Sequence, residues 1–367
     1  MQKKLIALAV AGLVSAPVFA QSNVTVYGIA DAYMGFGNHG GNDMAAVQSG
    51  GLSGSRLGFR GAEDLGNGLK AVFTLEQGFD ISSGVASPGV GGDSVFSRQA
   101  LVGLSGAFGT VSLGRQYAPG FDFQYDALLA SAVSPQFILS TGVGSSLSVS
   151  DFARWDNSVA YNGMFSGLKV RAIYSMAANE NTTMVAPGQY ADPSDDDAMG
   201  LGLEYANGPL KVGAVYQVLQ TASNAATADD QTEWMLGGSY NFGAATLALS
   251  YQDAESLGKV KGDDAKLWQV GVMVPVGAAG NVHLGYGEVK ADNVIGTNSA
   301  KSKSYSLAYT HALSKRTTAY TGYNRTDNDT GLALGPIADL DKTGRRVGNL
   351  VGGENSDLFV VGVRHTF

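Results

Sequence analysis

Alternation of apolar and polar residues is the dominant pattern of the chain, and it predicts β-strands. In residues 69–76 the odd-numbered positions are all apolar, whereas the even-numbered positions include Lys70, Thr74 and Glu76. Because successive side chains of a strand point to opposite faces, this stretch predicts a strand with one apolar and one polar face. Similar stretches recur along the chain, from residues 23–33 to 357–367.

The predicted strands form a repeating unit of two strands joined by a short turn and followed by a long polar loop. Each strand has about ten residues, the length with which a tilted β-strand crosses a membrane. We count sixteen strands, and an even number is typical of single-chain bacterial barrels. The pattern predicts an all-β fold, a closed sixteen-stranded antiparallel transmembrane β-barrel. The short turns fall at residues 64–68, 106–109, 166–167, 207–209, 242–243, 276–277 and 313–314.

The longest connection, at about residues 117–154, differs from the other loops because it is apolar. It contains Phe121, Phe123, Leu128 and Phe137, which a solvated loop would not need. Loops of this length are uncommon and usually functional. We therefore predict that this third long external loop folds inward against the barrel wall and narrows the pore.

The two ends of the chain point to export and to the outer membrane. Phe367, His365 and Val363 share one face of the last predicted strand, and a terminal aromatic residue in this setting indicates a C-terminal signature for the barrel assembly machinery. Residues 1–20 carry Lys3 and Lys4, an apolar core and small residues near Ala20. This order predicts a signal peptide, with a barrel over residues 21–367.

Composition narrows the class of protein. Cysteine is absent, which excludes disulfides and thiolate chemistry, and only 15% of residues are charged, below the usual quarter. After the signal, no stretch approaches eighteen apolar residues, so helical membrane spans are not expected. A formal net charge of −8 argues against a nucleic-acid partner.

Tyrosines near the predicted strand ends suggest contact with both membrane interfaces, where amphipathic rings gather. We expect some of them to form aromatic girdles: Tyr27, Tyr33, Tyr174, Tyr205, Tyr240, Tyr251, Tyr309 and Tyr320.

An ordered set of sequence stretches resembles the general porins of beta-proteobacteria, and the resemblance covers essentially the whole chain. The stretches are residues 24–31, 54–71, 98–106, 108–116 and 363–367. The resemblance implies a trimeric outer-membrane diffusion channel of a Gram-negative bacterium, without enzymatic activity, cofactor or metal. For the homotrimer, we expect Gly28, Gly58 and Gly103 to give the early strands a small outer surface.

The resemblance also implies a pore constriction in which basic wall residues face an acidic loop. Arg56 and Arg60 share a face opposite Leu57 and Phe59, so their parity indicates the lumen. Arg98 aligns with apolar positions, which leaves two alternatives: a place above the lipid at the strand start, or an intervening bulge. The charges could attract ions, pin the loop by pairing with one another, or do both. The candidate constriction residues are Arg56, Arg60, Arg98, Arg154, Glu76, Asp122, Asp126 and Asp151.

These observations predict passive diffusion of small hydrophilic solutes and ions, with weak anion selectivity because arginines in a narrow passage attract anions. Two alternatives remain open: a substrate-specific outer-membrane channel, or an adhesin or structural surface protein anchored by the barrel. The four histidines have no serine, carboxylate or second histidine beside them in a catalytic pattern. Besides the assembly machinery, we expect outer-membrane lipid and lipopolysaccharide as partners.

Overall fold

The structure is a computed structural model that describes residues 23–40, 42–86, 95–129, 131–176, 184–186, 189–190, 197–221, 225–293, 299–336 and 352–367. The predicted signal peptide, residues 1–20, lies outside the described residues. None of the helices in these ranges has the length and apolar character of a membrane span.

The described elements are mostly long strands. They are β1 (Asn23–His39), β2 (Asn42–Ser49), β3 (Arg56–Gly66), β4 (Leu69–Gly78), β5 (Gln99–Gly106), β6 (Gly109–Tyr117), α2 (Pro119–Asp122), α3 (Pro135–Gly142), η1 (Asp151–Ala153), β7 (Arg154–Phe165), β8 (Leu168–Ser175), β9 (Met184–Ala186), β10 (Gln189–Tyr190), β11 (Ala198–Asn207), β12 (Leu210–Leu219), β13 (Gln231–Asn241), β14 (Thr246–Glu255), η3 (Leu257–Lys259), β15 (Asp264–Val276), β16 (Gly280–Asp292), β17 (Ala300–Ala312), β18 (Thr317–Asn328) and β19 (Ser356–Thr366).

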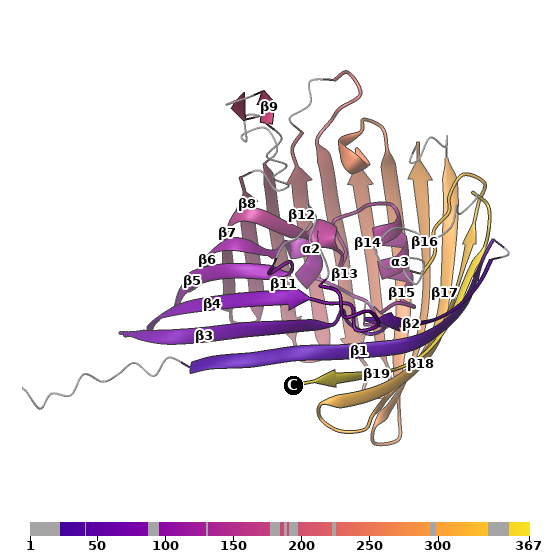
Figure 1. Cartoon of the computed structure of the whole chain (residues 1–367), viewed down its shortest axis with the longest axis horizontal. Helices are drawn as coiled ribbons and strands as arrows, with labels where there is room; N and C mark the ends of the chain where they lie inside the picture. The colour runs from indigo at the N-terminus through magenta and orange to yellow at the C-terminus, as the bar shows by residue number, and fades with distance from the viewer. Residues whose placement is uncertain are drawn as a thin grey trace, which may run out of the picture.

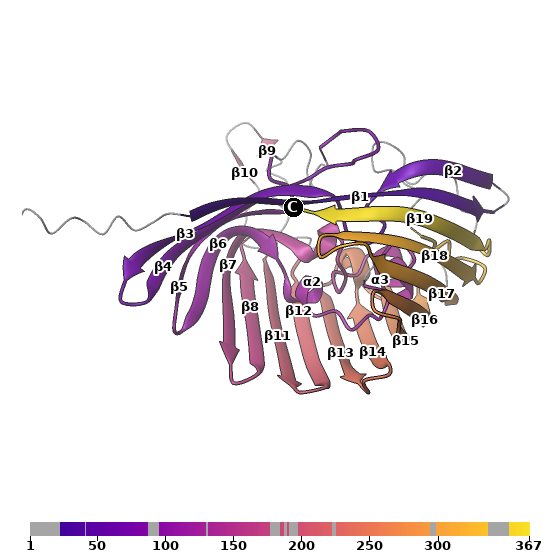
Figure 2. The same cartoon turned by 90° about the horizontal axis from the view of Figure 1, so that it is seen from below.

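Sixteen of the described strands close into one antiparallel ring (Figures 1 and 2). The ring closes because β1 pairs with β19 along one edge and with β3 along the other. β2 is an additional strand that pairs only with β1, and β9 pairs with β10 outside the ring. The predicted sixteen-stranded antiparallel barrel is confirmed.

The two faces of the wall differ in polarity as the alternation predicted. On β17, Tyr305 and Leu307 are 42% and 53% exposed on the outer face, whereas Ser304 and Ser306 are buried on the inner face. Such a barrel pairs its backbone groups between strands and presents apolar side chains to lipid.

The wall is interrupted beside β1, where the buried carboxylate of Asp31 binds the segment that leaves the ring. The N-terminal part of β1, residues 23–29, pairs with β3, and its C-terminal part, residues 32–39, pairs with β2. Residues 50–55, which connect these two partners, leave the ring. Asp31 holds this segment, because it accepts the N–H groups of Leu52 and Ser53 at 2.8 Å each and the hydroxyl of Tyr320. The carbonyl of Gly51 in turn accepts the N–H of Ala132 at 2.8 Å.

Three tyrosines predicted near the membrane interfaces lie inside the barrel instead. Tyr27 donates to Glu76, Tyr320 donates to Asp31, and Tyr33 is buried in a cluster with Leu358. Strand parity assigns all three to the inner face, so they cannot contact lipid. Tyr174, Tyr205 and Tyr240 are exposed on the outer face, as predicted.

The predicted small outer surface of the early strands is wrong at two of its three glycines. Gly58 shares the inner face with Arg56 and packs under the ring of Tyr27. Gly103 lies opposite the exposed Val102, and a Cβ there would meet Ser112 of the inner face. Only Gly28 is on the outer face, and the ring of Phe367 covers it.

The last residue completes the ring. The backbone N–H and C=O of Phe367 both pair with Gly28, at 3.1 Å each. Phe367 and Val363 are 46% and 47% exposed on the outer face, and His365 is exposed on the same face. The predicted signature residues therefore line the seam where the chain ends meet.

We expect Phe367→Ala to weaken this seam, because the ring that covers Gly28 is lost while the backbone pairing remains. The cost should be about 1–2 kcal/mol, less than for a fully buried phenylalanine. Urea unfolding in vesicles and the yield of folded barrel in outer membranes measure the effect, and Phe367→Tyr is the matched control. Equal yield and stability for Phe367→Ala and the wild type would contradict the role of the ring.

Candidate functional site

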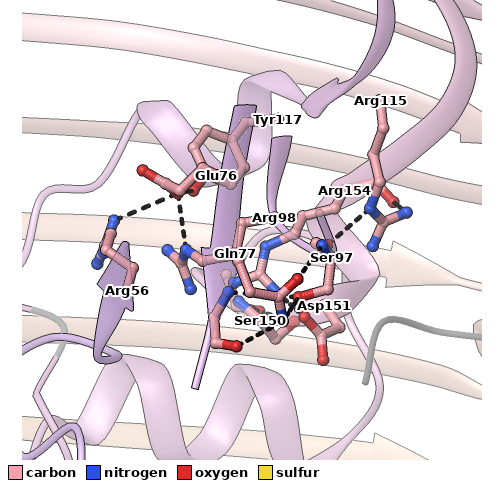
Figure 3. Close-up of polar contacts among 12 residues, drawn as sticks. Arg56, Glu76, Gln77, Ser97, Arg98, Arg115, Tyr117, Ser150, Asp151 and Arg154 are labelled. Carbon is pink, nitrogen blue, oxygen red and sulfur yellow. Dashed lines mark hydrogen bonds and ion pairs between the residues drawn. The ribbon is translucent and has the colours of Figure 1, made fainter. Parts of the chain in front are cut away.

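Glu76 is the centre of a charged cluster on the inner face (Figure 3). Its Oε1 lies 2.7 Å from Nε of Arg98 and 3.8 Å from Nη1 of Arg56. The hydroxyl of Tyr117 donates to the same oxygen at 2.6 Å, and that of Tyr27 donates to Oε2 at 3.0 Å. One buried carboxylate therefore holds two guanidinium groups, brought together from β3 and from the residue before β5.

Tyr117 places a third guanidinium beside the first two. Its ring stacks on Phe121 with centroids 3.7 Å apart, and the guanidinium carbons of Arg98 and Arg154 both lie 5.8 Å from its centroid. Arg154 also forms an ion pair with Asp151 of the adjacent 3₁₀ turn. Cation–π contact lets an aromatic ring bind cations without neutralising them.

The position of Arg98 agrees with the first of the two alternatives left by the sequence, a place at the start of the strand. Arg98 precedes the first residue of β5, its N–H donates to the carbonyl of Glu76 at 3.1 Å, and its side chain turns inward to the same residue. Because Arg98 lies outside the regular register of β5, the apolar face predicted from the alternation does not include it.

Two further arginines join the cluster, and neither was singled out from the sequence. Arg115 contacts Asp156 at 2.7 Å and the carbonyl of Ser97 at 2.7 Å. Arg171 contacts Asp122 at 2.7 Å, so it is the partner of that predicted residue. The signal for Arg115 was hidden by a register shift after Gly114 (φ +121°), which breaks the alternation.

Two predicted residues lie apart from these ion pairs. Asp126 accepts the N–H of Leu128 at 2.8 Å and the hydroxyl of Ser134, and therefore shapes the turn before α3. The guanidinium carbon of Arg60 lies 5.0 Å from the ring centroid of Tyr27, and no described carboxylate pairs with it.

The cluster contains N–H donors without a protein acceptor. Nε of Arg154, Nε of Arg171 and Nη2 of Arg115 are buried and have no hydrogen-bond partner in the described part of the chain. A buried unsatisfied donor is costly, and a charged one more so. Each of the three arginines also forms an ion pair through its Nη1 atom, which offsets part of this cost.

The segment after Tyr117 runs across the inner wall and is tied to it strand by strand. Figure 2 shows α2 and α3 inside the ring. Six consecutive strands, β12 to β17, each contribute one polar side chain that bonds this segment. The pairs are Gln217 with Gly120, Glu233 with Ser146, Gln252 with Leu147, Gln269 with Tyr125, His283 with Ala127, and Ser306 with Val133.

Glycines of the inner wall receive the apolar side chains of the same segment. The ring of Phe123 lies over Gly202, and Leu128 lies over Gly285. Tyr125 places its ring over Gly237 and its hydroxyl over Gly213. Burial and the nearby Glu204 carboxylate raise the pKa of Tyr125, so its hydroxyl stays protonated and donates to Glu204 at 3.1 Å.

Comparison with known proteins places this architecture in a family. The Gram-negative porin family matches residues 7–331. Outer membrane porin protein 32 of Delftia acidovorans is 33% identical over all of both chains. The chain belongs to the Gram-negative porins. Among solved structures, the anion-selective porin from Comamonas acidovorans is 29% identical, with a TM-score of 0.75 over 95% of this chain and 100% of that one. The trimer form of Vibrio cholerae OmpT shares the fold, at 18% identity and a TM-score of 0.63 over 94% of this chain and 99% of that one.

The family and the fold together define the basic activity. The porin lies in the outer membrane of a Gram-negative bacterium and forms a channel for passive diffusion. Its family and fold are those of channels that carry out no catalysis.

We expect Gly237→Ala to dislodge the inner segment of the porin, because the new Cβ would lie 2.2 Å from Cδ2 of Tyr125. Overpacking of this kind costs roughly 1–3 kcal/mol. Single-channel recordings should show larger and noisier currents.

The double variant Gly237→Ala with Tyr125→Ala tests the cause. Because the clash is absent in the double variant, the two effects on stability should be less than additive. Strictly additive effects would mean that the wall glycine and the tyrosine act independently.

Proposed function

We propose that this porin is weakly anion-selective and that its narrowest point lies between the 117–154 segment and the arginine cluster. The proposed constriction comprises Arg56, Arg60, Arg98, Arg154, Glu76, Asp122, Asp126 and Asp151, to which we add Arg115, Arg171 and Tyr117. Within it, we assign the arginines to anion attraction and the segment to narrowing of the passage.

The observation that carries the proposal is the crowding of guanidinium groups, which outnumber the carboxylates that pair with them. Glu76 is shared by Arg56 and Arg98, so five arginines of the cluster pair with only four carboxylates. A passing anion therefore meets a small surplus of positive charge, which attracts anions and repels cations. The anion-selective porin from Comamonas acidovorans, similar over nearly the whole chain, supports the same assignment.

We expect Arg154→Ala to move the reversal potential in a salt gradient toward the cation-selective side and to raise conductance, because it removes both a charge and bulk from the passage. Arg325→Ala is the matched control, since Arg325 lies on the outer face of β18. Wild-type reversal potentials in Arg56→Ala, Arg98→Ala and Arg154→Ala alike would exclude these arginines from the ion path. Saturation of the current by one sugar would favour a substrate-specific channel.

Orientation and export complete the proposal. We assign the short turns to the periplasm and the long connections to the outside, following the usual asymmetry of these barrels. We also assign residues 1–20 to a signal peptide removed on export, and the last strand to recognition by the barrel assembly machinery.

We further propose a homotrimer that associates through the wall sector of β5 to β7. Directly paired outer residues in this sector are aliphatic: Val102 pairs with Leu113, and Leu113 with Val159. Elsewhere, an outer belt of aromatic side chains runs from β12 through β19 to β1, as membrane-interface contact requires. The belt consists of Tyr216, Trp234, Tyr251, Trp268, Tyr286, Tyr305, Tyr323, Phe359 and Phe36.

A single cysteine with a photoreactive label tests this interface, and the chain offers a clean background because it contains no cysteine. We expect labelled Leu113→Cys to cross-link barrel to barrel on illumination, and labelled Leu249→Cys, which is equally exposed on β14, to remain uncross-linked. Cross-linking at Leu249 alone would move the interface to the opposite wall. Monomer alone on unheated gels would refute the trimer.

A further inference from the structure

Two stacked aromatic rings lie inside the barrel, between the inner segment and the arginine cluster. The rings of Tyr117 and of Phe121, in α2, are parallel to within 1°, and their centroids are 3.7 Å apart. Tyr117 is buried and its hydroxyl donates to Glu76 at 2.6 Å, whereas Phe121 is half-buried. Because α2 lies inside the ring of strands (Figure 2), the exposed part of Phe121 opens on the aqueous interior.

The guanidinium groups beside this stack leave the outer face of Phe121 uncovered. The guanidinium carbon of Arg154 lies 5.8 Å from the centroid of Tyr117 and 5.7 Å from that of Phe121. A point equally distant from two parallel rings lies beside their edges, level with the gap between them. Tyr117 covers one face of Phe121, and the opposite face is therefore the one that a solute can reach.

A second ring lies on the same wall, on the other side of Glu76. The hydroxyl of Tyr27 donates to Oε2 of Glu76 at 3.0 Å, whereas that of Tyr117 donates to Oε1. The half-buried Tyr27 packs against Gly58, where a Cβ would lie only 2.5 Å from its Cζ. The guanidinium carbon of Arg60 lies 5.0 Å from the ring centroid of Tyr27. Two pairs of an aromatic ring and a guanidinium group therefore flank Glu76.

A ring beside a guanidinium group matches a solute that has both a flat ring and a negative charge. Aromatic rings attract one another in offset-stacked arrangements, and guanidinium groups bind carboxylates. An aliphatic carboxylate meets the same arginines but gains no stacking. Since the arginines of the cluster outnumber the carboxylates that pair with them, part of their attraction for a solute anion remains.

We propose that the constriction binds small aromatic carboxylates in preference to aliphatic carboxylates of the same charge and size. The ring of the solute stacks on the outer face of Phe121, and its carboxylate faces the guanidinium groups of Arg98 and Arg154. This inference rests on the proposed anion selectivity, and it names the class of anions that the constriction favours.

Partial block of the chloride current in planar bilayers measures this preference. Benzoate and cyclohexanecarboxylate carry the same charge at neutral pH and are similar in size, but only benzoate has an aromatic face. For the wild type, we expect the half-blocking concentration of benzoate to be about fivefold lower than that of cyclohexanecarboxylate, the effect of one aromatic pair.

Phe121→Leu keeps apolar bulk at this position but removes the aromatic face. In this variant, the half-blocking concentrations of the two carboxylates should differ by no more than about twofold, the remainder that Tyr27 can supply. Phe121→Tyr keeps the aromatic face and should keep the wild-type preference, which separates loss of stacking from a disturbed α2. Phe359→Leu is the matched control, since Phe359 is 43% exposed on the outer face of β19, and its two concentrations should equal those of the wild type.

Two results would overturn the proposal. One is an equal half-blocking concentration of benzoate and cyclohexanecarboxylate in the wild type. The other is a parallel change for both carboxylates in Phe121→Leu, which would mean that the ring acts only through its bulk.

Reversal potentials in a chloride gradient report on anion selectivity separately from this block. An anion-selective wild type that does not distinguish the two carboxylates contradicts this inference alone. A cation-selective wild type contradicts the proposed anion selectivity, and this inference with it.

Discussion

The constraint on which this molecule depends is that a chain in lipid must satisfy its own backbone hydrogen bonds. Along one edge, β1 satisfies this constraint by pairing with β3 in its N-terminal part and with β2 in its C-terminal part. Along its other edge, β1 pairs with the last strand, β19. Closure also fixes which side chains face inward, because parity cannot change along a strand without a bulge. The positions of the charged residues in the pore follow from this geometry.

Inside the ring, the inner segment is attached to two sides of the wall by different kinds of side chain. On one side it is held by three glutamines, one serine, one histidine and the buried Glu233, on six strands from β12 to β17. The arginines are concentrated elsewhere, on β3, β6, β7 and β8 and just before β5. On the arginine side, Arg154 and Arg171 hold the segment through ion pairs with Asp151 and Asp122.

The sequence predicted the barrel well because strand alternation has a period of two, which can be read locally. The same alternation placed Arg56 and Glu76 each on the polar face of its own strand. It failed where local geometry departs from the regular strand: Arg115 follows a register shift, and Arg98 precedes its strand. It also could not tell inward from outward aromatic residues at strand ends, as Tyr27 and Tyr320 illustrate. The role of the wall glycines depends on side chains more than seventy residues away, which no local pattern encodes.

The interruption of the wall at residues 50–55 constrains how the protein can diverge. Asp31 binds that segment and Tyr320 together, and Gly51 passes the connection to Ala132 of the inner segment. A mutation that removes this carboxylate leaves two backbone N–H groups and one tyrosine hydroxyl without an acceptor at the same time. Replacement of Asp31 by a residue without an acceptor oxygen is therefore not neutral, and a descendant can dispense with this oxygen only by exchanging several groups together.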